Sequence, residues 1–350
     1  MPSRGQFKGS HPIASHRRAK QVQGAADSLH ILKSSLAFFD TIMNVSCPNE
    51  NITSILRTIQ LMTYIPTFII GFMLNSFALW IFCCSMKKYT EASIYLVNLA
   101  ILDFFLVLSL PSKIYFSQDE IKVNSHLCGF LQSLYFTNMY GSIYTITFIS
   151  LDRYIAIIHP FYARVLRSPK KTIIICVIIW VFVWSVSLIT FFNKEKSENV
   201  QCFHNLSENI WSPNIIIPLE MFGFVIPMIV MLYCSIQIIR TLLVPVSSSV
   251  DSEESKAVVI RIIICNLVVF VICFSFTHIG IFLQFLAKRQ IISDCTVRKH
   301  ISIFLQVALC ISNINCCLDA LCYYFSVKDF QAKLKYKPSV TQVENLNTSV

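Results

Sequence analysis

Long apolar blocks, separated by short polar segments, dominate the pattern of hydrophobic and polar positions along the chain. A helix needs about 20 apolar residues to cross the hydrocarbon core of a bilayer, whereas strands of a membrane barrel are about half as long and alternate in polarity. Seven blocks have the helical length: 61–84, 94–116, 127–158, 172–192, 212–243, 258–286 and 301–325. The pattern therefore predicts an all-α, multi-pass membrane protein built as a seven-helix bundle.

The composition agrees with a membrane-embedded chain. Of the 350 residues, 55% are hydrophobic and 14% are charged, whereas a soluble domain carries about 25% charged residues. The net charge of +10 comes from Lys and Arg residues scattered between the apolar blocks, not from a basic domain with interleaved aromatics. We therefore expect no nucleic-acid partner.

The basic residues of the short loops predict the orientation, because cytoplasmic loops carry the excess of Lys and Arg. They gather in the first and second loops between blocks and in the C-terminal tail, which all lie on one side of a seven-helix bundle. That side is predicted to be cytoplasmic, and the N-terminus extracellular. The basic positions are Lys87, Lys88, Arg164, Arg167, Lys170, Lys171, Lys328, Lys333, Lys335 and Lys337.

The predicted outer segments carry sequons for N-glycosylation at Asn44, Asn51 and Asn205. Residues 1–42 hold six basic and two acidic residues without helical periodicity, so we expect a disordered extension. Initiation of translation at Met43 is a hypothesis that makes this extension dispensable. The predicted organisation is an extracellular tail (1–56), a transmembrane domain (57–325) and a cytoplasmic segment (326–350).

The 14 cysteines divide by their predicted side of the membrane. Ten lie in or at the ends of apolar blocks and are predicted to be small buried hydrophobic side chains. The other four, Cys47, Cys128, Cys202 and Cys295, fall on the outer side, which is an oxidising compartment. Four cysteines allow three pairings, and the residues alone leave these open. Nothing has the Cys and His spacing of a zinc site.

Two carboxylates lie at membrane depth, Asp103 in the second block and Asp319 in the seventh. Ionisable groups are costly at this depth and are functional by default. If the two face one another, they form an oxygen-lined pocket fit for sodium or for a shared proton. A hydrogen-bonded packing cluster is the alternative, and the two readings are compatible. The polar residues at comparable depth are Asn75, Asn98, Ser142 and Asn315.

Lys113 follows Asp103 by ten residues and so lies about 15 Å nearer the outer surface in a helix. It either snorkels to the interface, as lysines at span ends commonly do, or turns inward because Pro111 loosens the helix. Glu220 in the fifth block and His278 in the sixth are further candidates to line a cavity. Each is equally well interpreted as half of an interhelical hydrogen bond.

Asp152, Arg153 and Tyr154 end the third block at its cytoplasmic edge. An acid beside an arginine there forms either a simple ion pair at the helix end or a lock whose release exposes the arginine. Phe161 follows in the basic loop.

These features together resemble the rhodopsin-like (class A) G protein-coupled receptors over about residues 55–335. Stretches 92–100, 109–113, 136–153 and 312–324 look most like lysophosphatidylinositol-sensing, cannabinoid-sensitive members of that family. The marks are Asn75, LAILD at 99–103, Cys128, Asp152-Arg153-Tyr154, Trp180, Pro227 and DALCY at 319–323.

The resemblance implies particular roles for individual residues. It implies disulfides from Cys128 to Cys202 and from Cys47 to Cys295, and an amphipathic eighth helix after the bundle. It implies a sodium pocket of Asp103, Ser142, Asn315 and Asp319, with no other metal or cofactor. It implies a G protein switch of Asp152, Arg153, Tyr154, Phe161 and Tyr323.

Several positions depart from the family pattern. Phe274 stands where a tryptophan is usual, Phe276 and Ala320 stand where prolines are usual, and Ser235 replaces a tyrosine. Because proline is a common cause of kinks, we expect less bend in the sixth and seventh helices.

The sequence predicts a plasma-membrane receptor for an anionic lysophospholipid, foremost lysophosphatidylinositol, and not an enzyme. Its resemblance implies signalling to Rho and calcium through twelve/thirteen-type or q-type G proteins, with arrestin and membrane lipids as further partners. A receptor of the same fold for a nucleotide, lysophosphatidic acid or a carboxylate is the alternative. Retinal binding is excluded, because block 301–325 has no lysine. The predicted ligand-binding residues are Lys113, Tyr135, Phe136, Met139, Tyr140, Phe274, His278 and Phe282.

Overall fold

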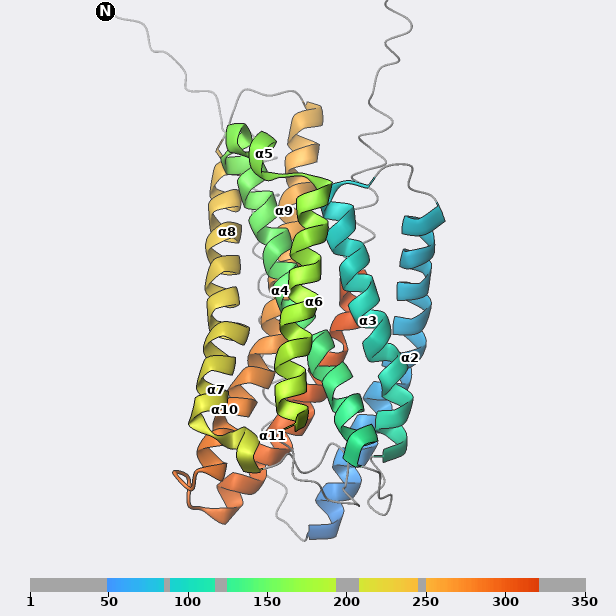
Figure 1. Cartoon of the computed structure of the whole chain (residues 1–350), viewed down its shortest axis with the longest axis vertical. Helices are drawn as coiled ribbons and strands as arrows, with labels where there is room; N and C mark the ends of the chain where they lie inside the picture. The colour runs from blue at the N-terminus through green and yellow to red at the C-terminus, as the bar shows by residue number, and fades with distance from the viewer. Residues whose placement is uncertain (1–48, 85–88, 117–124, 193–207, 245–249, 321–350) are drawn as a thin grey trace, which may run out of the picture. The chain divides into compact units, whose positions relative to one another are not determined.

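The computed structural model describes residues 49–84, 89–116, 125–192, 208–244 and 250–320. The chain divides into two compact units, Met1–Thr53 and Ser54–Val350, and the packing below concerns the second. In the described ranges the regular structure is helical, without strands (Figure 1). The elements are α2 (Asn49–Cys84), α3 (Glu91–Phe116), α4 (Ser125–Ile158), α5 (Pro160–Leu166), α6 (Pro169–Phe192), η1 (Glu208–Trp211), α7 (Pro213–Glu220), η2 (Met221–Val225), α8 (Ile226–Leu242), α9 (Val250–Phe270), η3 (Val271–Ser275), α10 (Phe276–Lys288) and α11 (Cys295–Asn313).

Seven passes run through this part of the chain, which confirms the predicted bundle. The fifth pass consists of α7, η2 and α8, and the sixth of α9, η3 and α10. The seventh begins as α11, and helix resumes after a single turn residue over 315–320. Six passes are long and apolar enough to cross a membrane by length and hydropathy alone. The remaining pass is α4.

Helix α4 is more polar because it occupies the centre of the bundle, where it packs against α3, α6, α8 and α9. Its polar side chains are buried in the protein, including Gln132, Asn138, Ser142 and Thr145. A helix surrounded by other helices meets little lipid, so it tolerates polar groups that find partners.

The outer faces of the peripheral helices are apolar and exposed, as expected for contact with lipid. On α2, Met62 and Trp80 are exposed, and on α6, Ile178 and Val181 are exposed. Such a continuous apolar surface is foreign to a soluble monomer but natural in a bilayer.

A buried amide joins three helices near the middle of the bundle. The Asn98 side chain on α3 donates from Nδ2 to Thr145 Oγ1 on α4 at 2.8 Å. Its Oδ1 accepts from Trp180 Nε1 on α6, also at 2.8 Å. Beside it, Gly141 lets α4 approach α3 closely, because a Cβ there would lie 2.6 Å from Leu102 Cδ2.

Both the fifth and the sixth passes contain a five-residue π-helical turn. In the fifth pass, Pro227 follows η2 and lacks the N–H that would bond to the carbonyl of Gly223, so the α-helical pattern is interrupted there. In the sixth pass, η3 contains Phe274 and ends immediately before Phe276. A π turn is itself a cause of kinks. The sequence did not predict the π turn η3, and the expectation of less bend in the sixth and seventh helices stays a prediction.

Candidate functional site

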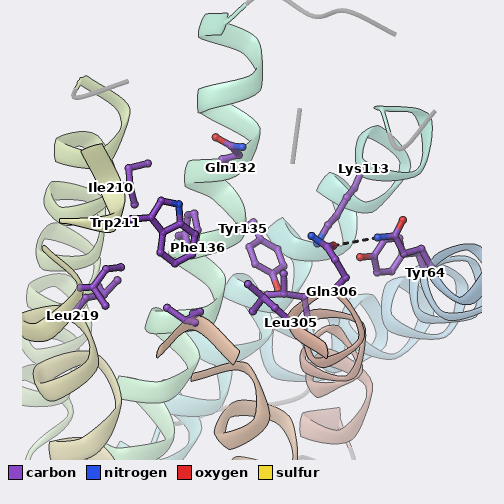
Figure 2. Close-up of a pocket in the computed structure, with 14 residues that line it drawn as sticks. Tyr64, Lys113, Gln132, Tyr135, Phe136, Ile210, Trp211, Leu219, Leu305 and Gln306 are labelled. Carbon is purple, nitrogen blue, oxygen red and sulfur yellow. Dashed lines mark hydrogen bonds between the residues drawn. The ribbon is translucent and has the colours of Figure 1, made fainter. Parts of the chain in front are cut away.

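A cavity lies among the outer halves of the helices, and Figure 2 shows the side chains around it. Its empty space, together with the part open to solvent, is about 880 Å³. The described lining consists of Gln60 and Tyr64 (α2), Lys113 (α3), Gln132, Tyr135 and Phe136 (α4), Ile210 and Trp211 (η1), Ile216 and Leu219 (α7), Ile281 (α10), and Leu305, Gln306 and Leu309 (α11).

Lys113 points into the bundle and is only 6% exposed. Its Nζ lies 4.0 Å from the ring centroid of Tyr135 and 5.0 Å from that of Tyr64. Aromatic faces attract cations and do so more strongly where water is excluded. Of the two predicted fates of this lysine, the structure therefore shows the inward one.

The cavity has a polar end and an apolar end. At the polar end, Lys113 lies near Tyr64 and Gln306, and Gln60 Nε2 donates to Gln306 Oε1 at 3.3 Å (Figure 2). At the other end, Trp211 and Leu219 face the space. Among the fourteen described lining residues, Lys113 carries the only charge. This arrangement suits an elongated ligand with one anionic, polar end and one apolar end.

The predicted ligand-binding residues divide into three groups. Lys113, Tyr135 and Phe136 line the cavity. Phe282 is 45% exposed and lies outside the lining. The others are buried away from the described lining: Met139, Tyr140, Phe274 and His278.

Sequence reasoning missed much of the lining, most clearly the three glutamines and Trp211. Gln60, Gln132 and Gln306 come from three different helices, so no motif in the sequence connects them. Gln132 lies one helical turn before Phe136 on α4, and this spacing was the available signal.

The predicted sodium pocket has a suitable set of oxygen atoms. Asp103 and Asp319 lie close enough for their charges to interact, and Asn315 Nδ2 donates to Asp319 Oδ2 at 2.7 Å. Ser142 Oγ and Asn315 Oδ1 are buried without a hydrogen-bond partner among the described residues. Asn138, which was not predicted, donates from Nδ2 to Asp103 Oδ1 at 3.4 Å. These groups fit a small hard cation, which prefers oxygen ligands.

Other metal sites find no support in the described ranges. No group of three or more His, Cys, Asp or Glu side chains there is placed to hold a metal ion. The sodium pocket holds two carboxylates, and its remaining ligands would be hydroxyl and amide oxygens.

At the cytoplasmic end, Asp152 is paired with Arg167. Arg167 donates to both carboxylate oxygens of Asp152, from Nε at 2.7 Å and from Nη2 at 3.0 Å. Arg167 Nη2 also donates to Glu91 Oε2 at 3.4 Å. Burial alone would lower the pKa of the Arg167 guanidinium, but hydrogen bonding and charge from Asp152, with the charge of Glu91, raise that pKa above its ordinary value. We call these three residues the inner ion cluster.

Two other predicted switch residues have their own surroundings. The Tyr154 ring lies 5.8 Å from that of Tyr233, and its hydroxyl lies 3.3 Å from His159 Nε2. Phe161 on α5 is 83% exposed. Tyr323 and the eighth helix lie outside the described residues.

The cysteines follow the prediction in part. Cys128 is disulfide-bonded, and its expected partner Cys202 lies outside the described residues. Cys295, at the first position of α11, is an exposed free thiol, so the structure lacks the predicted bond to Cys47. Five helix cysteines are buried and two are partly buried. Cys83 and Cys84, the last two residues of α2, are exposed.

The predicted glycosylation sites contribute little to the described structure. Asn51 lies in the first turn of α2, and Asn44 and Asn205 lie outside the described residues.

Comparison with known proteins places this architecture. Residues 74–323 match the family described as "7 transmembrane receptor (rhodopsin family)". The chain belongs to this family, the class A G protein-coupled receptors, and is a multi-pass protein of the plasma membrane. The family consists of receptors, which confirms that the chain is not an enzyme.

Two groups of relatives are informative. G-protein coupled receptor 55 of Mus musculus is 43% identical over 318 residues, which cover 87% of this chain and 97% of that protein. The Homo sapiens protein of the same name is 41% identical over 309 residues, covering 87% and 96%. Lysophosphatidic acid receptor 4 of Homo sapiens is 34% identical over 276 residues, covering 77% and 74%.

Proposed function

We propose that the chain is a cell-surface receptor for an anionic lysophospholipid, foremost lysophosphatidylinositol. The observation that carries the proposal is a largely apolar cavity with a single charge, the buried Lys113, at its polar end. A lysophospholipid has the matching shape, with one anionic headgroup and one acyl chain. The name of lysophosphatidic acid receptor 4, a relative, supports the same ligand class.

The polar end favours a phosphodiester headgroup with hydroxyl groups. One lysine balances the single charge of a phosphodiester, whereas a phosphomonoester carries up to two charges and a nucleoside triphosphate calls for several cations. Gln60, Gln132 and Gln306 add amide donors and acceptors, which suit the hydroxyls of inositol. Lysophosphatidic acid, a nucleotide or a carboxylate is therefore the weaker candidate.

The apolar end would take the start of the acyl chain. Trp211, Ile216, Leu219 and Ile281 supply this surface from η1, α7 and α10. Burial of a methylene group contributes about 0.8 kcal/mol, so a few chain carbons at this end add substantially to affinity. Phe136 lies between the two ends on α4 and would contact the glycerol.

Signalling would proceed from the cavity to the cytoplasmic end. A ligand bound between η1, α7, α10 and α11 favours one arrangement of the fifth and sixth passes over another. An outward position of the sixth pass would open a cleft at Arg153 for the C-terminal helix of Gα, with the exposed Phe161 beside it. We propose twelve/thirteen-type or q-type G proteins, with arrestin as a further partner. Lys170 and Lys171 would contact Gα or anionic inner-leaflet lipid.

Sodium would bind between Asp103 and Asp319, with Ser142 and Asn315 completing the ligand set. Its single positive charge would offset part of the negative charge of the two carboxylates and would hold the second, third and seventh passes together.

The test is the response of cells expressing Lys113→Ala to lysophosphatidylinositol, read as Rho activation and calcium release. We expect a loss of potency of about 100-fold, because hydrogen bonds to charged groups contribute about 1.5–3 kcal/mol. Arg289→Ala is the matched control, since Arg289 is an exposed cation of the outer end that does not line the cavity. An unchanged response of Lys113→Ala at equal surface expression would refute the headgroup assignment.

A further inference from the structure

A buried acid and base lie between the fifth and sixth passes, apart from the proposed headgroup site. His278 Nδ1 lies 3.0 Å from Glu220 Oε2, and the two residues are 1% and 9% exposed. The imidazole stacks on Phe224, with ring centroids 4.4 Å apart and planes 7° apart, and it meets the edge of Tyr140 at 5.7 Å. Ring packing thus fixes the histidine against the glutamate.

Three polar atoms of this cluster have no hydrogen-bond partner among the described residues. They are Glu220 Oε1, His278 Nε2 and the Tyr140 hydroxyl. Most buried polar side-chain atoms in proteins have such a partner, and each exception calls for an explanation. Three exceptions around one acid–base pair single out this cluster among the buried polar groups of the described residues.

The cluster lies about one helical turn below the cavity on each of three helices. Tyr140 follows the lining residue Phe136 by four positions on α4, and Glu220 follows Ile216 by four positions on α7. His278 precedes the lining residue Ile281 by three positions on α10. The pair therefore lies close beneath the cavity, which is the side from which a proton of the outer medium would arrive.

The other titratable groups of the neighbouring elements mostly face elsewhere. On α4, the Tyr144 hydroxyl donates to the Phe222 carbonyl. Tyr140, also on α4, interacts electrostatically with Glu220. From η3, Cys273 interacts with Asp319, and from α11 the Cys310 thiol faces Tyr64.

Among the described residues, the groups named next, from α10 and η1, carry no charge. Thr277, beside His278, donates to the Ala308 carbonyl of α11, and η1 contributes Trp211 to the cavity above. The charge of the cluster thus depends mainly on the protonation of Glu220 and His278.

We propose that Glu220 and His278 form a proton-binding site, and that a proton bound there raises the affinity of the receptor for its anionic ligand. The proposal rests on the proposed function, because it assumes a negatively charged ligand in the cavity. With a neutral imidazole, the pair carries one negative charge and repels the ligand. Histidine gains its proton within the physiological pH range, and the resulting ion pair is neutral overall. Acidification of the outer medium therefore removes the repulsion.

The experiment compares the potency of lysophosphatidylinositol at about pH 6 and about pH 8 in cells expressing the full chain. A phosphodiester keeps its charge over this interval. A phosphomonoester changes its own charge near pH 6, so a change in its potency could come from the ligand and not from the receptor. For the unaltered receptor we expect potency at the lower pH to be about threefold to tenfold higher, as expected for repulsion between a ligand anion in the cavity and a negative charge buried beneath it.

Two substitutions with opposite predicted effects isolate the pair. Glu220→Gln removes the negative charge, so we expect high potency at both pH values. His278→Asn keeps a polar group near Glu220 but cannot take up the proton, so we expect low potency at both. His300→Asn is the matched control, because His300 lies near the outer end of α11, outside the cavity, and this variant should keep the full pH dependence. Tyr140→Phe should also keep it, because the hydroxyl carries no charge in this range.

The outcomes separate the two proposals. If the unaltered receptor responds to lysophosphatidylinositol equally at both pH values, or if His278→Asn retains the pH dependence, the proton site is refuted and the proposed function stands. If the unaltered receptor responds to no lysophospholipid at either pH, the proposed function fails. Surface staining of an N-terminal epitope tag verifies delivery, and should Glu220→Gln not reach the surface, His278→Asn decides the question.

Discussion

Lys113 is a buried cation and Arg167 a partly buried one, near opposite ends of the bundle, and their surroundings differ. Lys113 lies against the rings of Tyr135 and Tyr64 in a cavity whose described lining contains no carboxylate. Arg167 is bound by the carboxylates of Asp152 and Glu91 at 2.7–3.4 Å. The two cations thus have different surroundings, aromatic rings for Lys113 and carboxylates for Arg167. The first is expected to govern ligand binding, and the second the resting conformation.

The largest expected effect is that of charge reversal at the outer cation. Lys113→Glu replaces attraction of the headgroup by repulsion, and we expect the potency of lysophosphatidylinositol to fall more than about 100-fold. Dose–response curves at matched surface expression measure this. Basal signalling should stay unchanged, so a large rise in basal signalling would blur the proposed division between the two ends.

At the inner ion cluster we expect a change in resting activity. Arg167→Ala removes the guanidinium that holds Asp152 and Glu91, and solvent screening of this partly exposed cluster limits the lost stability to about 1 kcal/mol. That free energy supports about a fivefold increase in the population of active receptor, measured as ligand-independent Rho or calcium signalling. Because its carboxylate partners hold the pKa of Arg167 above the ordinary value for arginine, the guanidinium keeps its charge in mild alkali, which should therefore not reproduce the effect. Unaltered basal signalling would contradict this role of the cluster.

A smaller effect is expected from the amides of the polar end. Gln306→Ala removes one partner of the Gln60–Gln306 hydrogen bond and an amide that faces the headgroup. We expect about a threefold loss of potency for lysophosphatidylinositol and little loss for lysophosphatidic acid, which lacks inositol hydroxyls. Gln284→Ala is the control, because Gln284 is bonded to Ser302 outside the cavity. Equal losses for both lipids would show that Gln306 does not contact inositol.

The smallest expected effect concerns sodium between the two ends. Replacing sodium by an organic cation in the medium should raise agonist potency about twofold, if sodium binds between Asp103 and Asp319 more tightly in the resting conformation than in the active one. Asp103→Asn should abolish this sensitivity. If the variant keeps the full sodium effect, the ion binds elsewhere.

The hydropathy pattern was sufficient to predict the seven passes and their order. Even α4, whose polar residues lower its hydropathy, was predicted from its length between polar loops. Helical spacing was not sufficient to predict the interruptions at η2 and η3, because a π turn depends on the hydrogen bonding of a few carbonyls. Pro227 was the one sequence signal near either π turn, and it lies just after η2.

The site was less predictable because it depends on which helix faces meet. The sequence suggested that Asp152 acts with its neighbour Arg153, but it could not show which residue outside this motif would reach the same carboxylate. In the structure Arg167, just after α5, binds Asp152. Similarly, Gln60 and Gln306 are 246 positions apart, and only packing brings them together.

The π turn η3 also sets the rotational register of everything that follows it in the sixth pass. If all five residues of Val271–Ser275 became ordinary α-helix, the wide turn would no longer absorb its extra residue. The outer half of the pass would then rotate by about 100° and move by about 1.5 Å along its axis. His278 would leave Glu220, and Ile281 would leave the cavity wall. The hydrogen-bond pattern of this short segment therefore positions the side chains that follow it.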